Sequence, residues 1–328
     1  MIQKRLPATL AMTFLAGLVA GCGGNGAPQS GTANDSSQAK SAGKGAASAE
    51  QVAEEARGRI KCPAKIKTQR DANPAVIDVV GVLPGMTYDE AANVVMCSHD
   101  LLVVTEDARR GFQLETYGAK VRKGFNASFA KERVEKTSKQ ILQEMQDNAM
   151  ARANNRVVRD VLPGESKWYV STMGLPGEER VINASREEWF EEGRQPTVTS
   201  IQEALTNKYG PPTEVQTPRN SAVQMRWAYD PRGRLITETS PLFQRCYGAA
   251  DPDVGSNVSP DCGVVVAAQI HPLRENPGLT QYLQVGVVDQ AGGYELLTQT
   301  EQALQQSETE RRAQQLEDAN KQAAKPTL

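Results

Sequence analysis

Cysteine and histidine are the side chains in this sequence best suited to bind a metal ion or to act as a nucleophile and its base. The 328-residue chain holds five cysteines and two histidines. The densest group is Cys97-Ser98-His99-Asp100, with Cys62 upstream. Zinc takes about four ligands, of which Cys62, Cys97 and His99 could supply three, and His99 could activate a cysteine nucleophile. No C-x-x-C pair accompanies this group, which weakens both interpretations.

Paired acidic residues form a second candidate for acid–base chemistry. Glu187-Glu188 and Glu191-Glu192 flank Trp189-Phe190. Glycoside hydrolysis needs two carboxylates roughly 5–9.5 Å apart in a cleft. Adjacent residues of a strand point to opposite faces of the sheet. We therefore expect these acids to lie on a solvent-exposed edge rather than in a shared site.

Other motifs that would carry catalysis are missing from the sequence. It contains no G-x-S-x-G, H-E-x-x-H or G-x-x-x-x-G-K-[ST] pattern. The second histidine, His271, stands at the end of a predicted strand before Pro272, where we expect a surface or cap residue. The sequence therefore predicts no catalytic, cofactor-binding or metal-binding residues, and no cofactor.

The first 22 residues have the pattern of an export signal. Lys4 and Arg5 precede an uncharged apolar run, Leu6 to Ala20, which ends in Val19-Ala20-Gly21-Cys22. That run is shorter than the ~20 apolar residues of a membrane-spanning helix. The pattern resembles the lipobox of bacterial lipoproteins, in which the cysteine is acylated and becomes the first residue after cleavage. The alternative is an ordinary secretion signal followed by a cysteine by chance.

The lipoprotein resemblance implies a lipid on Cys22 and a location in the bacterial cell envelope. The next residue is Gly23 rather than the Asp that resembles an inner-membrane retention signal, which favours the outer membrane, with the folded part in the periplasm. Several acyl chains together give stable anchoring. Residues 23–50 are rich in Gly, Ser and Ala, so residues 22–59 are predicted to be a flexible linker spanning roughly 35 Å.

The four remaining cysteines are expected to form disulfides, because an exported chain meets an oxidising compartment. Three connectivities are possible. We favour the sequential one, Cys62–Cys97 and Cys246–Cys262, because the second pair then closes a polar loop, residues 247–261, that cannot form a core of its own. In the chain-entropy model, loops of these sizes gain about 3–4 kcal/mol from closure.

Charge and composition narrow the class of function. The chain carries 37 basic and 39 acidic residues, a net charge of −2, and removal of residues 1–21 leaves 35 and 39, a net charge of −4. Neither value gives an electrostatic basis for nucleic-acid binding. Apolar residues make up 39% and aromatic residues 5%, so long polar segments are expected beside folded ones.

Hydrophobic periodicity predicts a mixture of short helices and strands after residue 50. Helices are predicted at 51–60, from Thr87, at 132–155, from Ser200 to Tyr209 and at 294–324, with Thr87/Glu90 and Ser200/Glu203 as capping boxes. Ile141, Leu142, Met145 and Ala149 form one narrow stripe in the helix at 132–155. Strands are predicted at 76–83, 101–105, 112–116, 124–130, 166–173, 180–190, 223–229, 234–238, 263–270 and 282–288.

Two segments follow the same plan and indicate a weak internal repeat. Thr87-Tyr-Asp-Glu-Ala91 and Ser200-Ile-Gln-Glu-Ala204 each open a helix that precedes a series of strands. With the flanking Leu83-Pro84-Gly85-Met86 and Gly210-Pro211-Pro212, they resemble the small outer-membrane lipoproteins of the β-barrel assembly machine (SmpA/OmlA type), which share a helix-plus-sheet plan with the β-lactamase-inhibitor protein. The first copy departs from that pattern, since it lacks the closing G-x-P.

Together these patterns predict an α+β protein built from tandem modules of short helices packed on antiparallel sheets. We expect a signal peptide at 1–21, a lipid-anchored linker at 22–59, a first module with an inserted helix at 60–160, a second module at 161–295 and a polar helical tail at 296–328. The predicted function is that of a non-catalytic lipoprotein, held to the membrane by the lipid on Cys22, that binds an envelope or exported protein in envelope maintenance or assembly.

Two alternatives from other classes stay open. An immunity or inhibitor lipoprotein could use its disulfide-closed loops to block a toxic enzyme. An envelope hydrolase could assemble its site from residues distant in sequence, and a deep pocket lined by His99 or His271 with a carboxylate would favour it.

Overall fold

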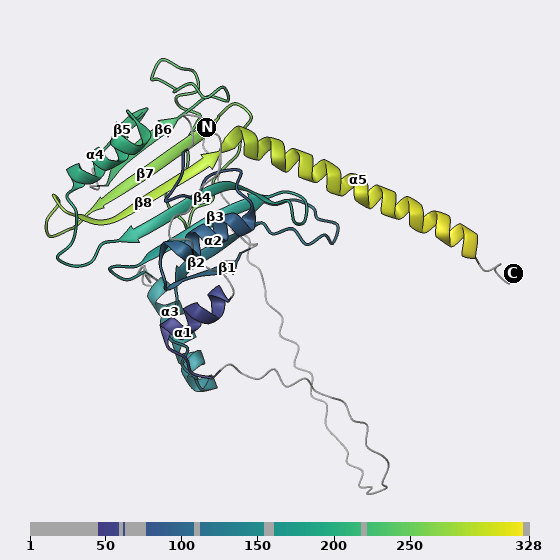
Figure 1. The fold of residues 1–328 in the computed structure, drawn as a ribbon, viewed down its shortest axis with the longest axis horizontal. Helices are drawn as coiled ribbons and strands as arrows, with labels where there is room; N and C mark the ends of the chain where they lie inside the picture. The colour runs from purple at the N-terminus through teal and green to yellow at the C-terminus, as the bar shows by residue number, and fades with distance from the viewer. Residues whose placement is uncertain are drawn as a thin grey trace, which may run out of the picture. The chain divides into compact units, whose positions relative to one another are not determined.

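The computed structural model describes residues 45–58, 62, 77–107, 112–153, 161–217 and 222–323. Cys22, the predicted signal peptide and most of the predicted linker lie outside these residues. The described part is an α+β fold with five helices and eight strands (Figure 1). The helices are α1 (Ala49–Arg57), α2 (Tyr88–Ser98), α3 (Ser138–Ala153), α4 (Val198–Tyr209) and α5 (Gln290–Gln322). The strands are β1 (Leu102–Glu106), β2 (Gly124–Phe129), β3 (Ser166–Met173), β4 (Arg180–Trp189), β5 (Glu214–Gln216), β6 (Val223–Ala228), β7 (Val264–Pro272) and β8 (Thr280–Asp289).

All eight strands join one antiparallel sheet in the order β1-β2-β3-β4-β8-β7-β6-β5. Each half of the sheet is a helix followed by a four-stranded meander: α2 with β1–β4, and α4 with β5–β8. The two meanders meet where β4 pairs with β8. At the centre of this pairing, Arg186 lies opposite Val285. The strand order therefore reads the same from either edge, as expected for two repeat units related by an approximate two-fold axis.

Backbone hydrogen bonds at the start of α2 close the first repeat unit. Thr87, which precedes α2, forms an antiparallel bridge with Arg180, the first residue of β4. The Tyr88 N–H donates to the Glu179 carbonyl, 3.2 Å away. The fourth strand of the unit is thus fastened to the beginning of the unit's own helix.

The second repeat unit is closed in the same way. Thr197, which precedes α4, bridges Leu279, next to the first residue of β8. The Val198 N–H donates to the Gly278 carbonyl, 3.0 Å away. By these bonds the repeat units run from 87 to 189 and from 197 to 289, so the predicted module boundary at 160 falls inside the first unit, between β2 and β3.

The sequence predicts a capping box at the start of α2 and another at the start of α4, and the structure confirms only the first. The Thr87 hydroxyl accepts from the Glu90 N–H (3.1 Å) and the Glu90 carboxylate accepts from the Thr87 N–H (2.8 Å), which confirms this capping box. The box predicted for Ser200 and Glu203 is wrong. Thr197 is the N-cap of α4, and its hydroxyl accepts from the Ser200 N–H (3.0 Å). The bridge of Thr197 to the sheet holds it extended and so starts the helix three residues earlier.

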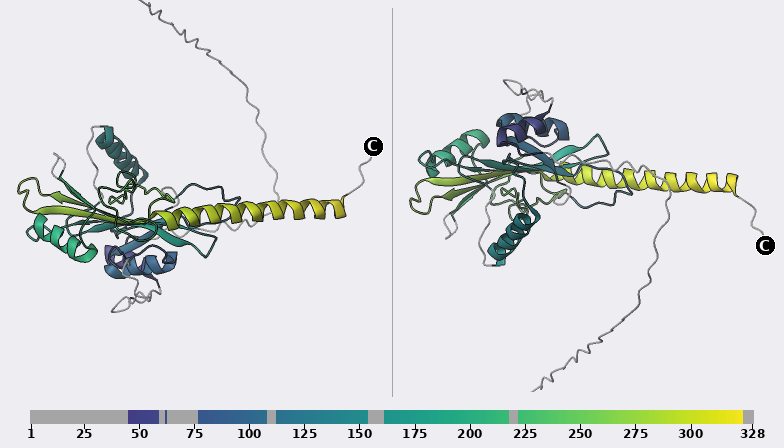
Figure 2. Two further views of the ribbon diagram at one scale, coloured as in Figure 1. Left: turned by 90° about the horizontal axis from the view of Figure 1, so that it is seen from above. Right: turned by 90° about the horizontal axis from the view of Figure 1, so that it is seen from below.

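Helices α2 and α4 lie on the same side of the sheet (Figure 2). Each places a tyrosine over an aromatic residue of its own strands, Tyr88 with Phe125 (5.2 Å between ring centroids) and Tyr209 with Trp227 (5.3 Å). The strands contribute apolar side chains to this helix-covered face at every second position, including fully buried Phe125, Trp168 and Trp227. Burial of each such side chain stabilises the fold by roughly 1.5–3 kcal/mol.

Three predicted strands are absent from the described residues. Val79 and Val82 are both buried, but Val80 and Gly81 have positive φ values of 45° and 85°, so the segment predicted as a strand at 76–83 is a tight turn. Residues 112–116 and 234–238 run along the fold without a strand partner, apart from the bridge between Tyr229 and Leu235. Strand β5 was not predicted, because three residues are too few to give a period.

The helices outside the repeat differ in how much of them is packed. Helix α1 falls within the predicted linker and contacts β1 at the edge of the sheet. Helix α5 is packed near its start, with Thr300 and Leu304 buried, and every residue from 309 to 323 is exposed. Helix α3 is shorter than the predicted 132–155. Among the described residues, no helix combines the length and apolarity needed to cross a bilayer.

Candidate partner-binding face

The four cysteines named as disulfide candidates are bonded in the sequential pairing, Cys62 to Cys97 and Cys246 to Cys262. The first bond fastens the segment before α2 to the last turn of that helix, since Cys97 is its penultimate residue. The second closes the long connection between β6 and β7. With their sulfurs bonded in pairs, these residues are not thiolate ligands or nucleophiles.

His99 has a structural place at the end of α2. Its Nδ1 accepts from the Leu101 N–H, 3.1 Å away, and its ring stacks on Phe129 at 4.3 Å between centroids. Within the described ranges, no group of three or more His, Cys, Asp or Glu side chains is placed to hold a metal ion. The cluster around Cys97 thus serves packing and helix termination.

The side of the sheet opposite α2 and α4 is crossed by a strap, defined here as residues 243–256. The strap passes so close to β8 that a Cβ added at Gly286 would lie 2.0 Å from the Ala249 carbonyl oxygen. Farther along, Asp253 pairs with the ammonium of Lys167 on β3. The strap and the start of α5 pack on one end of this side, over Ile182, Val265 and Val288. The other end is uncovered at Gln216 and Gln224, which are exposed, and at Gln269, which is half-buried. We call the uncovered end the open face.

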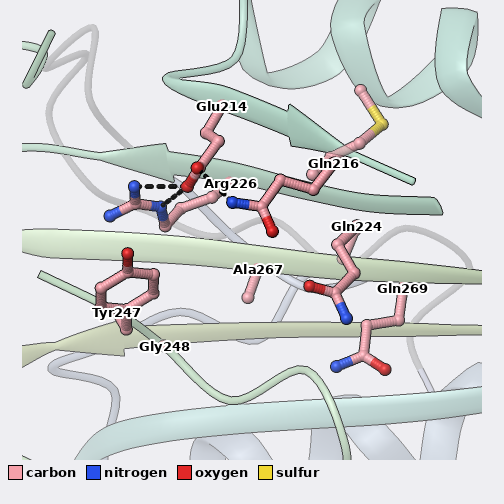
Figure 3. Close-up of a pocket in the computed structure, with 10 residues that line it drawn as sticks. Glu214, Gln216, Gln224, Arg226, Tyr247, Gly248, Ala267 and Gln269 are labelled. Carbon is pink, nitrogen blue, oxygen red and sulfur yellow. Dashed lines mark hydrogen bonds and ion pairs between the residues drawn. The ribbon is translucent and has the colours of Figure 1, made fainter. Parts of the chain in front are cut away.

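Arg226 on β6 fixes the strap to the sheet. Its guanidinium donates to the carbonyls of Phe243 (2.8 Å) and Cys246 (2.7 Å) and to the Glu214 carboxylate (2.6 Å). The Tyr247 ring lies over it, 4.1 Å from the guanidinium carbon to the ring centroid. Arg226 is buried, so these bonds satisfy a charge that would otherwise be expensive to bury. Figure 3 shows the paired guanidinium and carboxylate beside Tyr247.

A row of four glutamines runs across the open face. Gln216, Gln224, Gln269 and Gln284 lie directly opposite one another on β5, β6, β7 and β8. The side chains of Gln224 and Gln269 form no hydrogen bond with other described residues, and Figure 3 shows them side by side on neighbouring strands. An amide offers two donors and an acceptor, so Gln224 and Gln269 present hydrogen-bonding groups to a ligand, whereas Gln284 is buried and its amide is bonded to Glu187.

Glu187 extends the glutamine row onto β4, opposite Gln284. Its carboxylate accepts from the Trp189 indole N–H (2.7 Å) and from the Gln284 amide (2.6 Å). Glu188 points to the other face of the sheet and pairs with Arg186 (2.6 Å). The two acids do lie on opposite faces, but the expected solvent-exposed edge is wrong. Strand β4 is central, because β3 and β8 pair with its two sides, and Glu187 is buried.

Beside the glutamines, three aromatic rings stack across β4, β8 and β7. Trp189 and Tyr282 stack with centroids 4.4 Å apart and 12° between planes, and Tyr282 and His271 with 4.0 Å and 9°. His271 Nε2 also lies 3.3 Å from the Gln284 amide oxygen. His271 is therefore a half-buried member of this aromatic row, within β7, rather than a surface or cap residue. Stacked pairs add about 0.5–1.5 kcal/mol beyond burial and stiffen the face.

A shallow pocket lies where the strap meets the glutamine row. It has a volume of about 90 Å³ and is lined by Arg226, Tyr247, Gln224 and Gln269, among others. Sites for drug-sized ligands are roughly 300–1,000 Å³, so this pocket suits a single side chain. Neither histidine lines it.

Sequence reasoning missed the open face altogether. The sequence feature that could have indicated this face is the alternation of polar and apolar residues in β6, β7 and β8, with Gln224, Gln269 and Gln284 at polar positions. The alternation does not show that these glutamines are neighbours, because that depends on how the strands pair. Comparison with known proteins adds no assignment: the chain matches no protein-family model, no curated protein and no solved structure.

Proposed function

We propose that this protein is a non-catalytic lipoprotein, anchored through Cys22 and facing the periplasm, whose open face binds a protein partner in envelope maintenance or assembly. The observation that carries the proposal is the pair Gln224 and Gln269, whose side chains have no hydrogen-bonding partner among the described residues, beside the half-buried stacked rings of His271 and Tyr282. Amide and aromatic side chains in a row of this kind offer hydrogen bonds and apolar contact at once.

The dimensions of the open face favour a macromolecular partner. The exposed and half-buried members of the row, Gln216, Gln224 and Gln269, span three neighbouring strands, or roughly 10 Å at ~4.8 Å per strand. Buried Gln284 and Glu187 continue the row beneath the surface. Protein interfaces are rich in aromatic residues and carry about one hydrogen bond per 100–200 Å². The pocket beside Tyr247 would receive one projecting side chain of the partner.

Rigidity supports the same proposal. The face is carried by hydrogen-bonded strands from β5 at the edge to β4 at the centre of the sheet, and its rim is fastened by Arg226 and by the Cys246–Cys262 disulfide. Side chains that are already ordered lose little entropy when a partner binds. The strap lies along the sheet, held at both Arg226 and Lys167, and so forms part of this surface rather than a projecting loop.

The lipid anchor would confine the search for a partner to the envelope. From Cys22 to Gly45 the chain has 23 residues, which gives a flexible tether a span of roughly 25–29 Å. A folded part on such a tether stays close to the membrane and meets membrane-associated partners at a high effective concentration.

The experiment is in-cell crosslinking followed by affinity purification of the tagged full chain. The test variant is Gln224→Arg/Gln269→Arg, and the matched control is Glu203→Arg on the exposed side of α4. We expect a specific envelope or exported protein to copurify with the native chain and the control. Recovery should fall at least tenfold with the test variant and with Cys22→Ala.

Identical recovery with the native chain and the test variant would contradict the proposal. If the protein lost with the test variant is a toxic enzyme, the same face would serve an immunity or inhibitor function.

A further inference from the structure

Helix α3 carries an apolar stripe that no other part of the described structure covers. Ile141, Leu142 and Met145 are 47%, 57% and 65% exposed. At 100° per residue they lie within an arc of about 100°. In α2 and α4, apolar side chains such as Val95 and Leu205 are buried against the sheet, whereas the stripe of α3 stays exposed.

The chain enters the fold from its N-terminal side directly beside the start of α3. Ala47 and Arg133 form an isolated antiparallel bridge, with reciprocal N–H to carbonyl distances of 3.0 and 2.9 Å. The Arg133 guanidinium also pairs with Glu55 of α1 (2.9 Å). Arg133 is five residues before Ser138, the first residue of α3. The segment that comes from Cys22 is therefore fastened at the base of this helix.

Tether length and helix length agree with a common contact to one surface. If the 23 residues from Cys22 to Gly45 form the flexible linker that the sequence predicts, they span roughly 25–29 Å. Helix α3 has 16 residues and is about 24 Å long. A bilayer that holds the lipid of Cys22 is thus within reach of the whole helix.

We propose that α3 docks lengthwise on the bilayer surface, with Ile141, Leu142 and Met145 in the boundary between headgroups and acyl chains. This inference rests on the lipid anchor of the proposed function. The polar side chains of the opposite side stay in water, among them Asp147, whose carboxylate accepts from the Gln143 amide (3.0 Å). Amphipathic helices bind membranes in this way, lying in the interface without crossing it. The bridge between Ala47 and Arg133 places α3 at the end of the segment that leads from the anchor, which favours the bilayer over a second protein as the occupant.

The test uses the native, lipidated full chain reconstituted in vesicles of phosphatidylethanolamine and phosphatidylglycerol. A polarity-sensitive fluorophore is placed on a cysteine at position 145, and in a matched sample at position 143, which lies about 200° away around the helix. We expect a severalfold rise in fluorescence at 145, with quenching by spin-labelled lipid, and no change at 143. The substitutions Ile141→Glu and Leu142→Glu should abolish the response at 145 without shifting the denaturation midpoint, because both side chains are about half exposed and neither belongs to a hydrophobic core cluster of the described residues.

Three results would overturn the inference. The label at 145 stays as water-exposed as at 143 although the protein floats with the vesicles, which removes the docking of α3 and leaves the partner-binding function standing. The label at 145 responds only when envelope proteins are added, which makes the occupant a protein. The native chain fails to float with vesicles, which removes the lipid anchor and so also contradicts that part of the proposed function.

Discussion

The two repeat units carry long connections at equivalent places, and these connections differ in how they use the sheet. Between β2 and β3 lie residues 130–165, and between β6 and β7 lie residues 229–263. The second connection folds back as the strap, buries Phe243 and Cys246, and is held by Arg226. The first contains α3, whose apolar residues stay exposed. The two connections are nearly equal in length and stand at equivalent positions, but only the second is packed into the fold, whereas the first keeps an apolar surface exposed.

Buried charge pairs sharpen this comparison, because each unit has one. In the second unit Arg226 pairs with Glu214 (2.6 Å) and holds the strap. In the first unit Arg122 pairs with buried Glu179 (3.2 Å) and holds the connection from β1 to β2 against the turn before β4. Neither pair reaches α3. Disruption of the strap should therefore cost stability, whereas changes in α3 should not.

The largest effect is expected from Arg226→Ala. The substitution leaves Glu214 and two strap carbonyls without their donor, and removal of one member of a buried charge pair costs about 3–5 kcal/mol. The measurement is the free energy of unfolding in urea. Arg234→Ala is the control, since Arg234 pairs with Asp230 at the surface and such pairs contribute only ~0–1 kcal/mol. Equal losses of unfolding free energy in Arg226→Ala and Arg234→Ala would contradict the claim that the buried charge pair of Arg226 fastens the second connection to the sheet.

Opening the second disulfide is expected to have the next largest effect. Cys246 and Cys262 are 16 residues apart, and the chain-entropy model assigns about 3 kcal/mol to closure of such a loop. The double variant Cys246→Ser/Cys262→Ser should lose that much unfolding free energy. It should also show faster amide hydrogen exchange in the strap, with α3 unchanged. Unchanged exchange in the strap would mean that Arg226 alone fixes it.

Gly286→Ala tests the close approach of the strap to β8. The new methyl group would collide with the Ala249 carbonyl oxygen and with Ser185 Oγ, 2.0 and 2.9 Å from the Cβ position. We expect a loss of about 1–3 kcal/mol in unfolding free energy, the usual cost of overpacking. The control is Gly278→Ala, whose nearest neighbour would be Asn276 Oδ1 at 3.4 Å. A stability equal to that of the control would show that the strap can lift from the sheet at little cost.

The charge pair between Arg122 and Glu179 in the first unit should make the free energy of unfolding decrease at low pH. Burial of the Glu179 carboxylate opposes its ionisation, but hydrogen bonds from the Arg122 backbone and side chain outweigh this and lower its pKa below the usual 4.5. The unfolded chain then binds more protons than the folded chain as the pH falls below about 4.5, so stability is lost in that range. Glu179→Gln should flatten the decline of unfolding free energy between pH 5 and pH 3. Parallel curves for both proteins would contradict this assignment.

The smallest effect is expected for Leu142→Ala in α3. Its side chain is 57% exposed, and surface substitutions usually change stability by no more than about 0.5 kcal/mol. Leu205→Ala in α4 provides the contrast, because Leu205 is buried against the sheet and such a truncation costs about 2–5 kcal/mol. Urea unfolding of both variants measures the difference. A loss above 2 kcal/mol for Leu142→Ala would mean that α3 packs on the fold.

Local signals in the sequence identified most elements, whereas the candidate site depends on strand register. The capping box of Thr87 and the alternation in β6 could be read directly, because caps and periods are properties of neighbouring residues. The turn at Val80 and Gly81 was misread as strand, since two buried valines dominate its pattern. The burial of Glu187 could not be foreseen, because it follows from the pairing of β4 with β8, about 100 residues apart in the sequence.

The most direct test of the account is photo-crosslinking in intact cells from three single positions, with each adduct identified by mass spectrometry. Position 224 reports on the open face, position 145 on the exposed stripe of α3, and position 203 on the outer side of α4. The account predicts a specific protein adduct from 224, a lipid adduct from 145 and neither from 203. The same protein adducts from 224 and 203, or no adduct from 224 at efficient crosslinking, would contradict the claim that the open face is the partner-binding surface.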